Sequence, residues 1–342
     1  MRGKHTVIVE VLSGLSVLGL CLGIGGCKGK HRESRTLYDV GGQILGIWRC
    51  PPSRIAVRTG DWELFEFAEG DWANPVMQVG LGGRPLYLSW PVSGGVWIGI
   101  EESLGGNKRV CVVEAETGRS LHKFPVPDEM EVRAFGASPD GDVIAWVEQL
   151  QGVKVGGADS VLFVVRMAEG AAPTRLTWRT NGAVQLCSVS QGGRYVAVDG
   201  VVWNTETKRV VLQDNAFYPS AQVWSGSGDH LYWVNSFGEI ACWEIGSERG
   251  SRTFLKTVPA PAMVGYEADR LMATDVSPDD KLLAVSTEFS REVLILNAMT
   301  GEQVTAFSVV GYPVTYLRFD SDSNGIIFAQ SQGGALRYCR VR

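Results

Sequence analysis

The chain has few residues whose types and spacing would suit catalysis. After the N-terminal segment its histidines are His31, His122 and His230, which stand apart from one another in the sequence. The sequence contains no HExxH, GxSxG or GxxxxGK pattern, and no GxGxxG between a strand and a helix. We expect His122 and His230 to be surface or turn residues. We therefore predict no catalytic residues and no cofactor.

One acidic loop has the composition of a cation site. Asp320, Asp322 and Asn324, followed by Gly325, read D-x-D-x-N-G, which is the first half of an oxygen-ligand calcium loop. The acidic residue expected six positions after the glycine is replaced by Ser331. We interpret the loop as an ordinary polar turn that holds no metal, and calcium binding at Asp320, Asp322 and Asn324 remains the alternative.

The composition excludes several classes of protein. The chain has 342 residues, of which 45% are hydrophobic and 20% are charged, and it contains 42 Gly and 11 Trp. These values exclude a disordered, collagen-like or polytopic membrane protein, and they favour a buried core divided by many tight turns. The formal net charge is −5 and there is no long basic run, so nothing indicates a nucleic-acid partner.

The N-terminus has the pattern of an export signal. Arg2 and Lys4 precede an apolar stretch that contains one charge, Glu10, and ends in Ile24-Gly25-Gly26-Cys27. A short basic segment, an apolar stretch and small residues are typical of a secretory signal peptide. An uncleaved anchor helix, or a cytoplasmic protein with an apolar N-terminus, are the alternatives.

The last four of these residues resemble the lipobox of bacterial lipoproteins. The resemblance implies that the chain is cleaved before Cys27, that this cysteine carries acyl chains such as palmitate, and that the protein lies in the cell envelope facing the periplasm or exterior. Lys28 stands where an Asp often retains such proteins in the inner membrane, so the outer membrane is slightly favoured. We divide the chain into a signal peptide (1–26), a lipidated basic tether (27–35) and a folded domain (36–342).

A short motif repeats through the folded domain. Ser138-Pro139-Asp140-Gly141 and Ser277-Pro278-Asp279-Asp280 each lie between two apolar runs, which is a strand–turn–strand pattern. Looser copies recur at a mean spacing of about 45 residues. The first turn residues of the seven copies are Cys50, Pro91, Ser138, Ser190, Ser225, Ser277 and Asp320. A third strand, a second turn and a fourth strand complete each copy.

Four short strands in each repeat are the unit of one propeller blade. The sequence resembles a WD-repeat-like or quinoprotein-like β-propeller, and the resemblance covers nearly all of the folded domain. It implies an all-β, seven-bladed propeller of four-stranded antiparallel blades. No Gly-His pair opens the copies and no Trp-Asp pair closes them. We therefore expect apolar packing between sheets to hold the blades together.

The seventh copy lacks a fourth strand. It supplies strands at about 314–320, 325–330 and 335–341, and the sequence then ends. Residues 36–40 precede the first copy and read as a strand. We predict that they pair with the last strand and close the ring, because two unpaired sheet edges would otherwise remain.

Five cysteines after Cys27 are far apart in the sequence and form no CxxC, zinc or haem pattern. We interpret them as small buried apolar side chains. One or two disulfides between neighbouring blades are the alternative, which an exported location would permit. The five are Cys50, Cys111, Cys187, Cys242 and Cys339.

Aromatic residues precede the first strand of three consecutive repeats. Tyr218, Tyr266 and Tyr312 recur at nearly the repeat length, and two of them precede a proline. Arg84 holds a similar place, and we place Trp178 in the same group. Aromatic and Arg side chains on one rigid face are typical of binding hot spots. The alternative is that these residues stiffen the connections and pack on the next blade.

The sequence favours a lipid-anchored propeller that binds other envelope proteins or holds them together, without catalysis. An enzyme is the first alternative, because related propellers include lactonases and quinone-dependent dehydrogenases. Trp90, Trp97 and Trp224 would be the stacking candidates for a quinone. A domain that senses a glycan or peptide is the second alternative.

Overall fold

A computed structural model describes residues 34–341 of the chain. The description omits residues 41–42, 51–53, 60–62, 69–70, 72–74, 76, 81–85, 93–95, 103–106, 115–118, 153–157, 168–171, 181, 215–218, 247–250 and 261–267. The chain divides into two units, Met1–Lys30 and His31–Arg342, and all described residues belong to the second.

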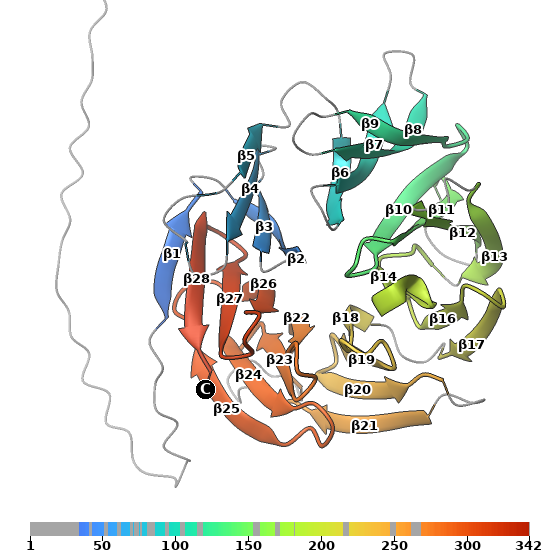
Figure 1. Ribbon diagram of the computed structural model, residues 1–342. Helices are drawn as coiled ribbons and strands as arrows, with labels where there is room; N and C mark the ends of the chain where they lie inside the picture. Colours follow the sequence, from blue (N-terminus) through green and yellow to red (C-terminus); the bar gives the residue numbers. More distant parts are fainter. Residues whose placement is uncertain are drawn as a thin grey trace, which may run out of the picture. The chain divides into compact units, whose positions relative to one another are not determined.

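The described residues form seven four-stranded antiparallel sheets arranged around a common axis (Figure 1). In each sheet the first strand is innermost and the fourth is outermost, which confirms the predicted all-β architecture. The first three blades are β2 (Ile44–Cys50), β3 (Arg54–Thr59), β4 (Glu63–Ala68) and β5 (Met77–Gly80); β6 (Leu86–Val92), β7 (Val96–Glu102), β8 (Lys108–Glu114) and β9 (Ser120–Pro125); and β10 (Met130–Ala137), β11 (Val143–Leu150), β12 (Ala158–Arg166) and β13 (Thr174–Thr180).

The fourth blade also contains a short 3-10 helix, η2 (Gln191–Gly193), between its first two strands. The remaining strands are β14 (Cys187–Val189), β15 (Tyr195–Val198), β16 (Val201–Asn204) and β17 (Arg209–Gln213); β18 (Pro219–Trp224), β19 (His230–Asn235), β20 (Glu239–Glu244) and β21 (Ser251–Thr257); β22 (Leu271–Val276), β23 (Leu282–Thr287), β24 (Glu292–Asn297) and β25 (Gln303–Ser308); and β26 (Val314–Phe319), β27 (Gly325–Gln330), β28 (Ala335–Arg340) and β1 (Arg35–Asp39).

Apolar side chains from neighbouring blades form the core. Among the residues that the structure describes, six clusters of buried side chains each combine two successive blades, so these sheets pack face to face. Between the second and third blades, Trp146 stacks between Phe124 and Phe163, with ring centroids 5.1 and 4.9 Å away. These contacts confirm the expectation that apolar packing joins the blades.

The recurring serine explains why the repeat motif closes so tightly. Ser138, Ser190, Ser225 and Ser277 are buried, and each hydroxyl accepts a hydrogen bond from the N–H five residues later at 2.9–3.0 Å. Each serine N–H also donates to the carbonyl of that same residue. The side chain thereby satisfies a buried backbone donor that the turn would otherwise leave unpaired.

Carboxylates add polar contacts between blades at these turns. The Asp140 carboxylate accepts the Gly192 N–H of the next blade at 2.9 Å. The Asp280 carboxylate accepts the N–H groups of Gly226 and Ser227 in the preceding blade, at 2.6 and 3.1 Å. A carboxylate at the third motif position in one copy, Asp140, and at the fourth in another, Asp280, therefore also joins neighbouring turns, which the sequence did not predict.

The predicted ring closure is confirmed. β1 pairs antiparallel with β28 and supplies the fourth strand of the seventh blade. The Tyr38 ring of β1 lies against Phe65 and Phe67 of the first blade, with centroids 6.0 and 5.1 Å away. A segment from the start of the folded domain thus joins its last blade to its first.

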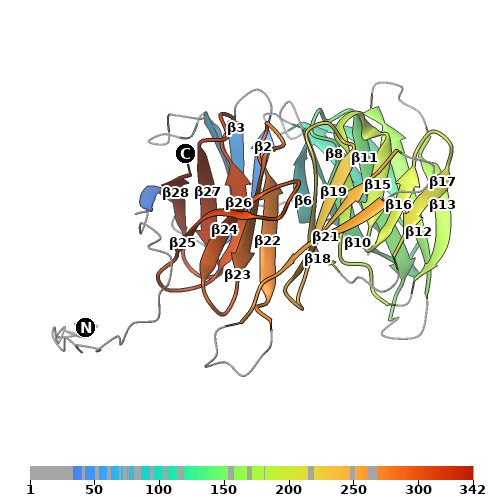
Figure 2. The ribbon, with the colours of Figure 1, turned by 90° about the horizontal axis from the view of Figure 1, so that it is seen from below.

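The strand order gives the ring two distinct ends. At one end of the ring, the first strand of each blade turns into the second and the third turns into the fourth. We call this end the turn face. We call the opposite end the connection face, where each fourth strand leads to the next first strand and each second strand turns into the third. In the side view of Figure 2 the strands run between these two ends.

Four of the five cysteines lie in the described structure as free thiols; Cys111, Cys242 and Cys339 are buried as predicted, whereas Cys187 is only partly buried. Burial raises the pKa of Cys111 to about 12 and that of Cys242 to about 11, so both thiols are protonated at neutral pH. The Cys50 side chain lies outside the described residues. Within the described ranges, no helix has the length and apolar character needed to cross a membrane.

Candidate binding face

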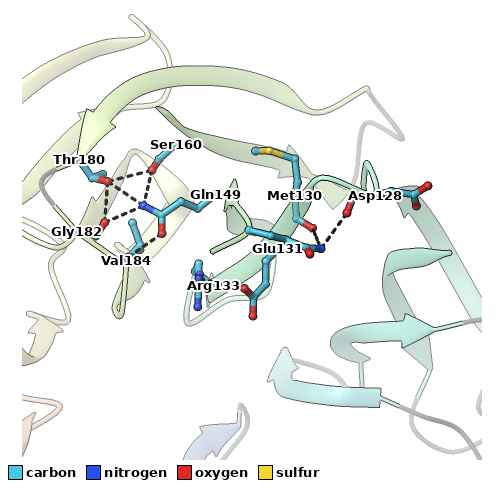
Figure 3. Close-up of polar contacts among 10 residues, drawn as sticks. Asp128, Met130, Glu131, Arg133, Gln149, Ser160, Thr180, Gly182 and Val184 are labelled. Atoms are coloured by element: carbon cyan, nitrogen blue, oxygen red, sulfur yellow. Dashed lines mark hydrogen bonds and ion pairs between the residues drawn. The ribbon is translucent and has the colours of Figure 1, made fainter. Parts of the chain in front are cut away.

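Polar side chains near the ends of second strands hold the loops of the connection face. In the third blade Gln149 is fully buried, and its Nε2 donates to Thr180 Oγ1 at 2.9 Å and to the Gly182 carbonyl at 2.7 Å. Its Oε1 accepts the Val184 N–H at 3.4 Å. Figure 3 shows Gln149 among these partners. One side chain therefore fixes the backbone that leads from the third blade to the fourth.

Gln330 plays the corresponding part in the seventh blade. Its Nε2 donates to the carbonyls of Val310 and Tyr312, at 2.8 and 2.5 Å. The Val309 N–H donates to the Arg291 carbonyl at 2.8 Å, so the connection is held at a third point. The side chains on this fixed backbone point outward: Val310 is 87% exposed and Tyr312 is 49% exposed.

Another exposed apolar residue, Phe237, lies on the connection face of the fifth blade. The turn between β19 and β20 is closed by Asn235, whose Oδ1 accepts the N–H groups of Phe237 and Glu239 at 3.0 and 2.9 Å. Gly238 has a φ of 76°, and a Cβ there would lie 2.8 Å from backbone oxygens of Val258 and Asp269. Phe237 is 65% exposed on this tightly closed turn.

Two carboxylates, of which Asp269 is fully buried, hold other loops of the same face. Asp269 accepts the N–H groups of Phe289 and Ser290, both at 2.9 Å. Asp199 accepts the N–H groups of Gln185 and Leu186, both at 2.8 Å. Burial raises the pKa of Asp199 to about 6, although the two N–H donors favour its charged form.

The innermost strands carry ion pairs. Arg133 and Glu131 both belong to β10, and their charged groups are 3.0 Å apart; Figure 3 shows them side by side. Arg318 of β26 lies 3.8 Å from Asp275 of β22, and Asp275 also accepts the Phe319 N–H at 2.8 Å. The Arg318–Asp275 pair therefore joins two blades near the axis.

The structure agrees with the predicted position of one site residue and not with that of another. Tyr312 lies in a connection before a first strand, as the repeat phase predicts, and is exposed. Tyr218, Tyr266 and Arg84 lie outside the described residues. Trp178 lies within β13, where its ring contacts Trp203 of the fourth blade edge-on at 6.0 Å. Its placement in a connection was incorrect, because this strand alternates apolar and polar residues and turns Trp178 toward the next blade.

Two exposed residues of the connection face were not predicted from the sequence. Phe237 and Val310 belong to no repeated motif. The sequence does contain a feature that predicts the exposure of Phe237, since this large aromatic residue lies in a short turn between Ser236 and Gly238. An apolar side chain in such a turn has little to pack against within its own sheet.

The described residues contain no group of three or more His, Cys, Asp or Glu side chains that could hold a metal ion. In the acidic loop, Asp320 takes the place of the turn serine. One carboxylate oxygen accepts the Asn324 N–H at 2.8 Å, and the other accepts the Tyr338 hydroxyl at 3.0 Å. This geometry supports the interpretation of the loop as a turn.

No family model matches the sequence, and no curated protein matches it. Among solved structures, the chain is similar to the WD40 repeats of RRP9, with a TM-score of 0.67 and 12% identity; the match covers 92% of this chain and 100% of that chain. A structure of U3-55K has a TM-score of 0.64 and 13% identity, covering 90% of this chain and 98% of that chain. The fold is that of a WD40-like β-propeller. At these identities the similarity concerns the fold alone.

Proposed function

We propose that this protein is a non-catalytic, lipid-anchored propeller that binds other proteins at the bacterial cell envelope through its connection face. The observation that carries the proposal is the exposure of Val310 and Tyr312 on a backbone held by Gln330. Phe237 adds a further exposed apolar side chain on the same face.

Rigid exposed aromatic groups are suited to protein recognition. A large apolar side chain on a preformed loop gains contact area on binding, and little backbone entropy is lost. Tyr combines an apolar ring with a hydroxyl that can form a hydrogen bond, which is why it is frequent in binding hot spots. Val310 and Tyr312 share one short connection and can therefore enter one contact together.

The lipid anchor rests on the N-terminal sequence. Ile24-Gly25-Gly26-Cys27 follows an apolar stretch and precedes the basic residues Lys28 and Lys30. Two or three acyl chains, each gaining about 0.8 kcal/mol per buried CH₂, would give stable membrane attachment. Lys28 directly after Cys27 favours the outer membrane in organisms that sort lipoproteins by this residue.

The test uses the full chain expressed in a bacterium, with detergent extraction and crosslinking of bound proteins. The double variant Val310→Ser/Tyr312→Ala should lower the affinity for a captured partner at least about tenfold. Val304→Ser is the matched control, because Val304 is 57% exposed but lies on the outermost strand β25. Equal capture by the double variant and the control would overturn the binding-face proposal.

The anchor is tested separately. Metabolic labelling with palmitate should mark the wild-type protein, and Cys27→Ala should abolish the label and release the chain from the membrane fraction. A membrane-bound but unlabelled wild-type protein would indicate an uncleaved anchor helix instead.

A further inference from the structure

The tether joins the propeller at the turn face. β1 begins at Arg35, which is paired with Tyr338 near the end of β28. The Arg35 guanidinium lies 5.4 Å from the centre of the Tyr338 ring, and the Tyr338 hydroxyl donates to Asp320 at 3.0 Å. Asp320 begins the turn between β26 and β27, so these contacts fix the start of β1 beside that turn.

The exposed residues lie at the other end of the same blade. β1 finishes with Asp39 opposite Ala335, and the next N–H, that of Val40, donates to the Gly334 carbonyl at 2.9 Å. This is the end of the blade at which β27 finishes, at Gln330. Gln330 in turn holds the connection that carries Val310 and Tyr312. The height of the blade therefore separates Arg35 from the candidate binding residues.

We propose that the anchored protein turns its connection face away from the membrane, and that the occupant of this face is a water-soluble protein rather than lipid. This inference rests on the proposed function, because it requires the anchor at Cys27. It adds the direction from which the partner approaches: from the aqueous compartment, toward the end of the ring opposite the tether.

The length of the tether favours this orientation. Residues 27–34 lie between the lipid and β1, and eight residues span at most about 28 Å when fully extended. A flexible chain of eight residues has an average end-to-end distance of about 16 Å. The blade itself is about 20 Å tall, as expected for strands of six residues. To lay the connection face on the membrane, the tether would have to run back along the blade at about seven-tenths of its full extension, which is longer than the average distance of a flexible chain and costs conformational entropy.

The charge near the exposed pair indicates the chemistry of the partner. Arg291 is exposed, its carbonyl holds the connection at Val309, and none of the described carboxylates forms an ion pair with it. Arg and Tyr are both enriched in binding hot spots. We therefore expect the partner surface to combine an apolar pocket for Val310 and Tyr312 with a carboxylate for Arg291.

The orientation can be measured without knowing the partner. Val310→Cys places a thiol on the connection face, and Met299→Cys places one on the turn face, where Met299 is 58% exposed between β24 and β25. Each variant is purified in its lipidated form, labelled with a fluorophore and inserted into vesicles of phosphatidylethanolamine and phosphatidylglycerol that contain a headgroup quencher. The labelled parent chain gives the background from native thiols.

Quenching should be at least about twofold stronger for the label at residue 299 than for the label at residue 310. A long Gly/Ser insertion into the tether should reduce this difference, because a longer tether permits more orientations. Equal quenching at the two positions, or stronger quenching at residue 310, would overturn the orientation, and the latter would indicate that the face contacts headgroups.

Absence of the lipid anchor would give a different result from a wrong orientation. If mass spectrometry finds no acyl chain on Cys27 and the protein does not bind the vesicles, the anchor is absent and this inference falls with it. If either cysteine variant fails to fold, Glu302→Cys on the turn face and Phe237→Cys on the connection face provide a second pair, since both side chains are exposed.

Discussion

The two ends of the propeller are built in different ways. On the turn face, four turns are closed by the same pair of hydrogen bonds around a buried serine: Ser138, Ser190, Ser225 and Ser277. On the connection face of the third to seventh blades, the loops are held by side chains of several types, namely Gln149, Asp199, Asn235, Asp269 and Gln330.

This difference indicates a division of labour. The turn face repeats in these four blades because each must reverse the chain and satisfy one buried N–H group. The connection face varies because each loop has its own length and path. A varied face can present side chains that no other blade carries, and the exposed residues Phe237, Val310 and Tyr312 lie there.

Removal of the closing strand should have the largest effect, because it acts on both faces. Deleting residues 36–40 removes the partner of β28 and the contact of Tyr38 with Phe65 and Phe67. We expect a loss of at least about 4 kcal/mol in the free energy of unfolding, and a fall of about 10 °C in Tm. Calorimetry would measure it, with deletion of residues 29–33 of the tether as the control.

Asp199, which holds a loop of the connection face, should make the free energy of unfolding depend on pH. Its pKa of about 6 lies above the value of 3.8 for an unperturbed Asp, so its contribution to folding is complete below pH 4 and is lost as the pH rises to 6. Asp199→Asn removes this titration. The free energy of unfolding of the wild type, relative to the variant, should fall by about 2 kcal/mol between pH 4 and 7; a constant difference would contradict the raised pKa of Asp199.

Alanine substitutions at two adjacent glycines of the turn face separate the cost of a steric clash from the cost of backbone strain. Gly192 and Gly193 both have a φ of 68°, but a Cβ would meet open space at Gly192, whereas at Gly193 it would lie 2.0 Å from Val143 Cγ2. Both alanine variants carry the strain of a positive φ. Gly193→Ala should therefore be less stable than Gly192→Ala by about 2 kcal/mol in denaturant unfolding. Equal losses would show that Val143 moves freely.

The repeated serine should have the smallest of these effects. Ser277→Ala leaves the buried Leu282 N–H without its side-chain acceptor at 2.9 Å. The expected loss in the free energy of unfolding is about 1 kcal/mol. Ser308→Ala, an exposed serine of the same blade, is the control and should change stability by less than about 0.5 kcal/mol. A loss no greater than that of the control would mean that the motif does not stabilise the turn.

Part of the candidate site could be predicted from the sequence. The phase of the repeat placed Tyr312 in a connection before a first strand, and the structure agrees. The same reasoning placed Trp178 incorrectly, because a strand of alternating residues and a loop containing an aromatic residue look alike over a short stretch. Phe237 and Val310 were missed because exposure depends on what the neighbouring blade covers.

The sequence by itself determined the seven repeats and the closing strand, because apolar runs separated by turns are local features that recur in every copy, and a serine closes the turn in four of them. Only the tertiary structure decided which side chains remain exposed, which carboxylates join neighbouring blades and which end of the ring receives the tether. These properties depend on contacts between blades, where residues far apart in the sequence meet, and no local pattern specifies such contacts.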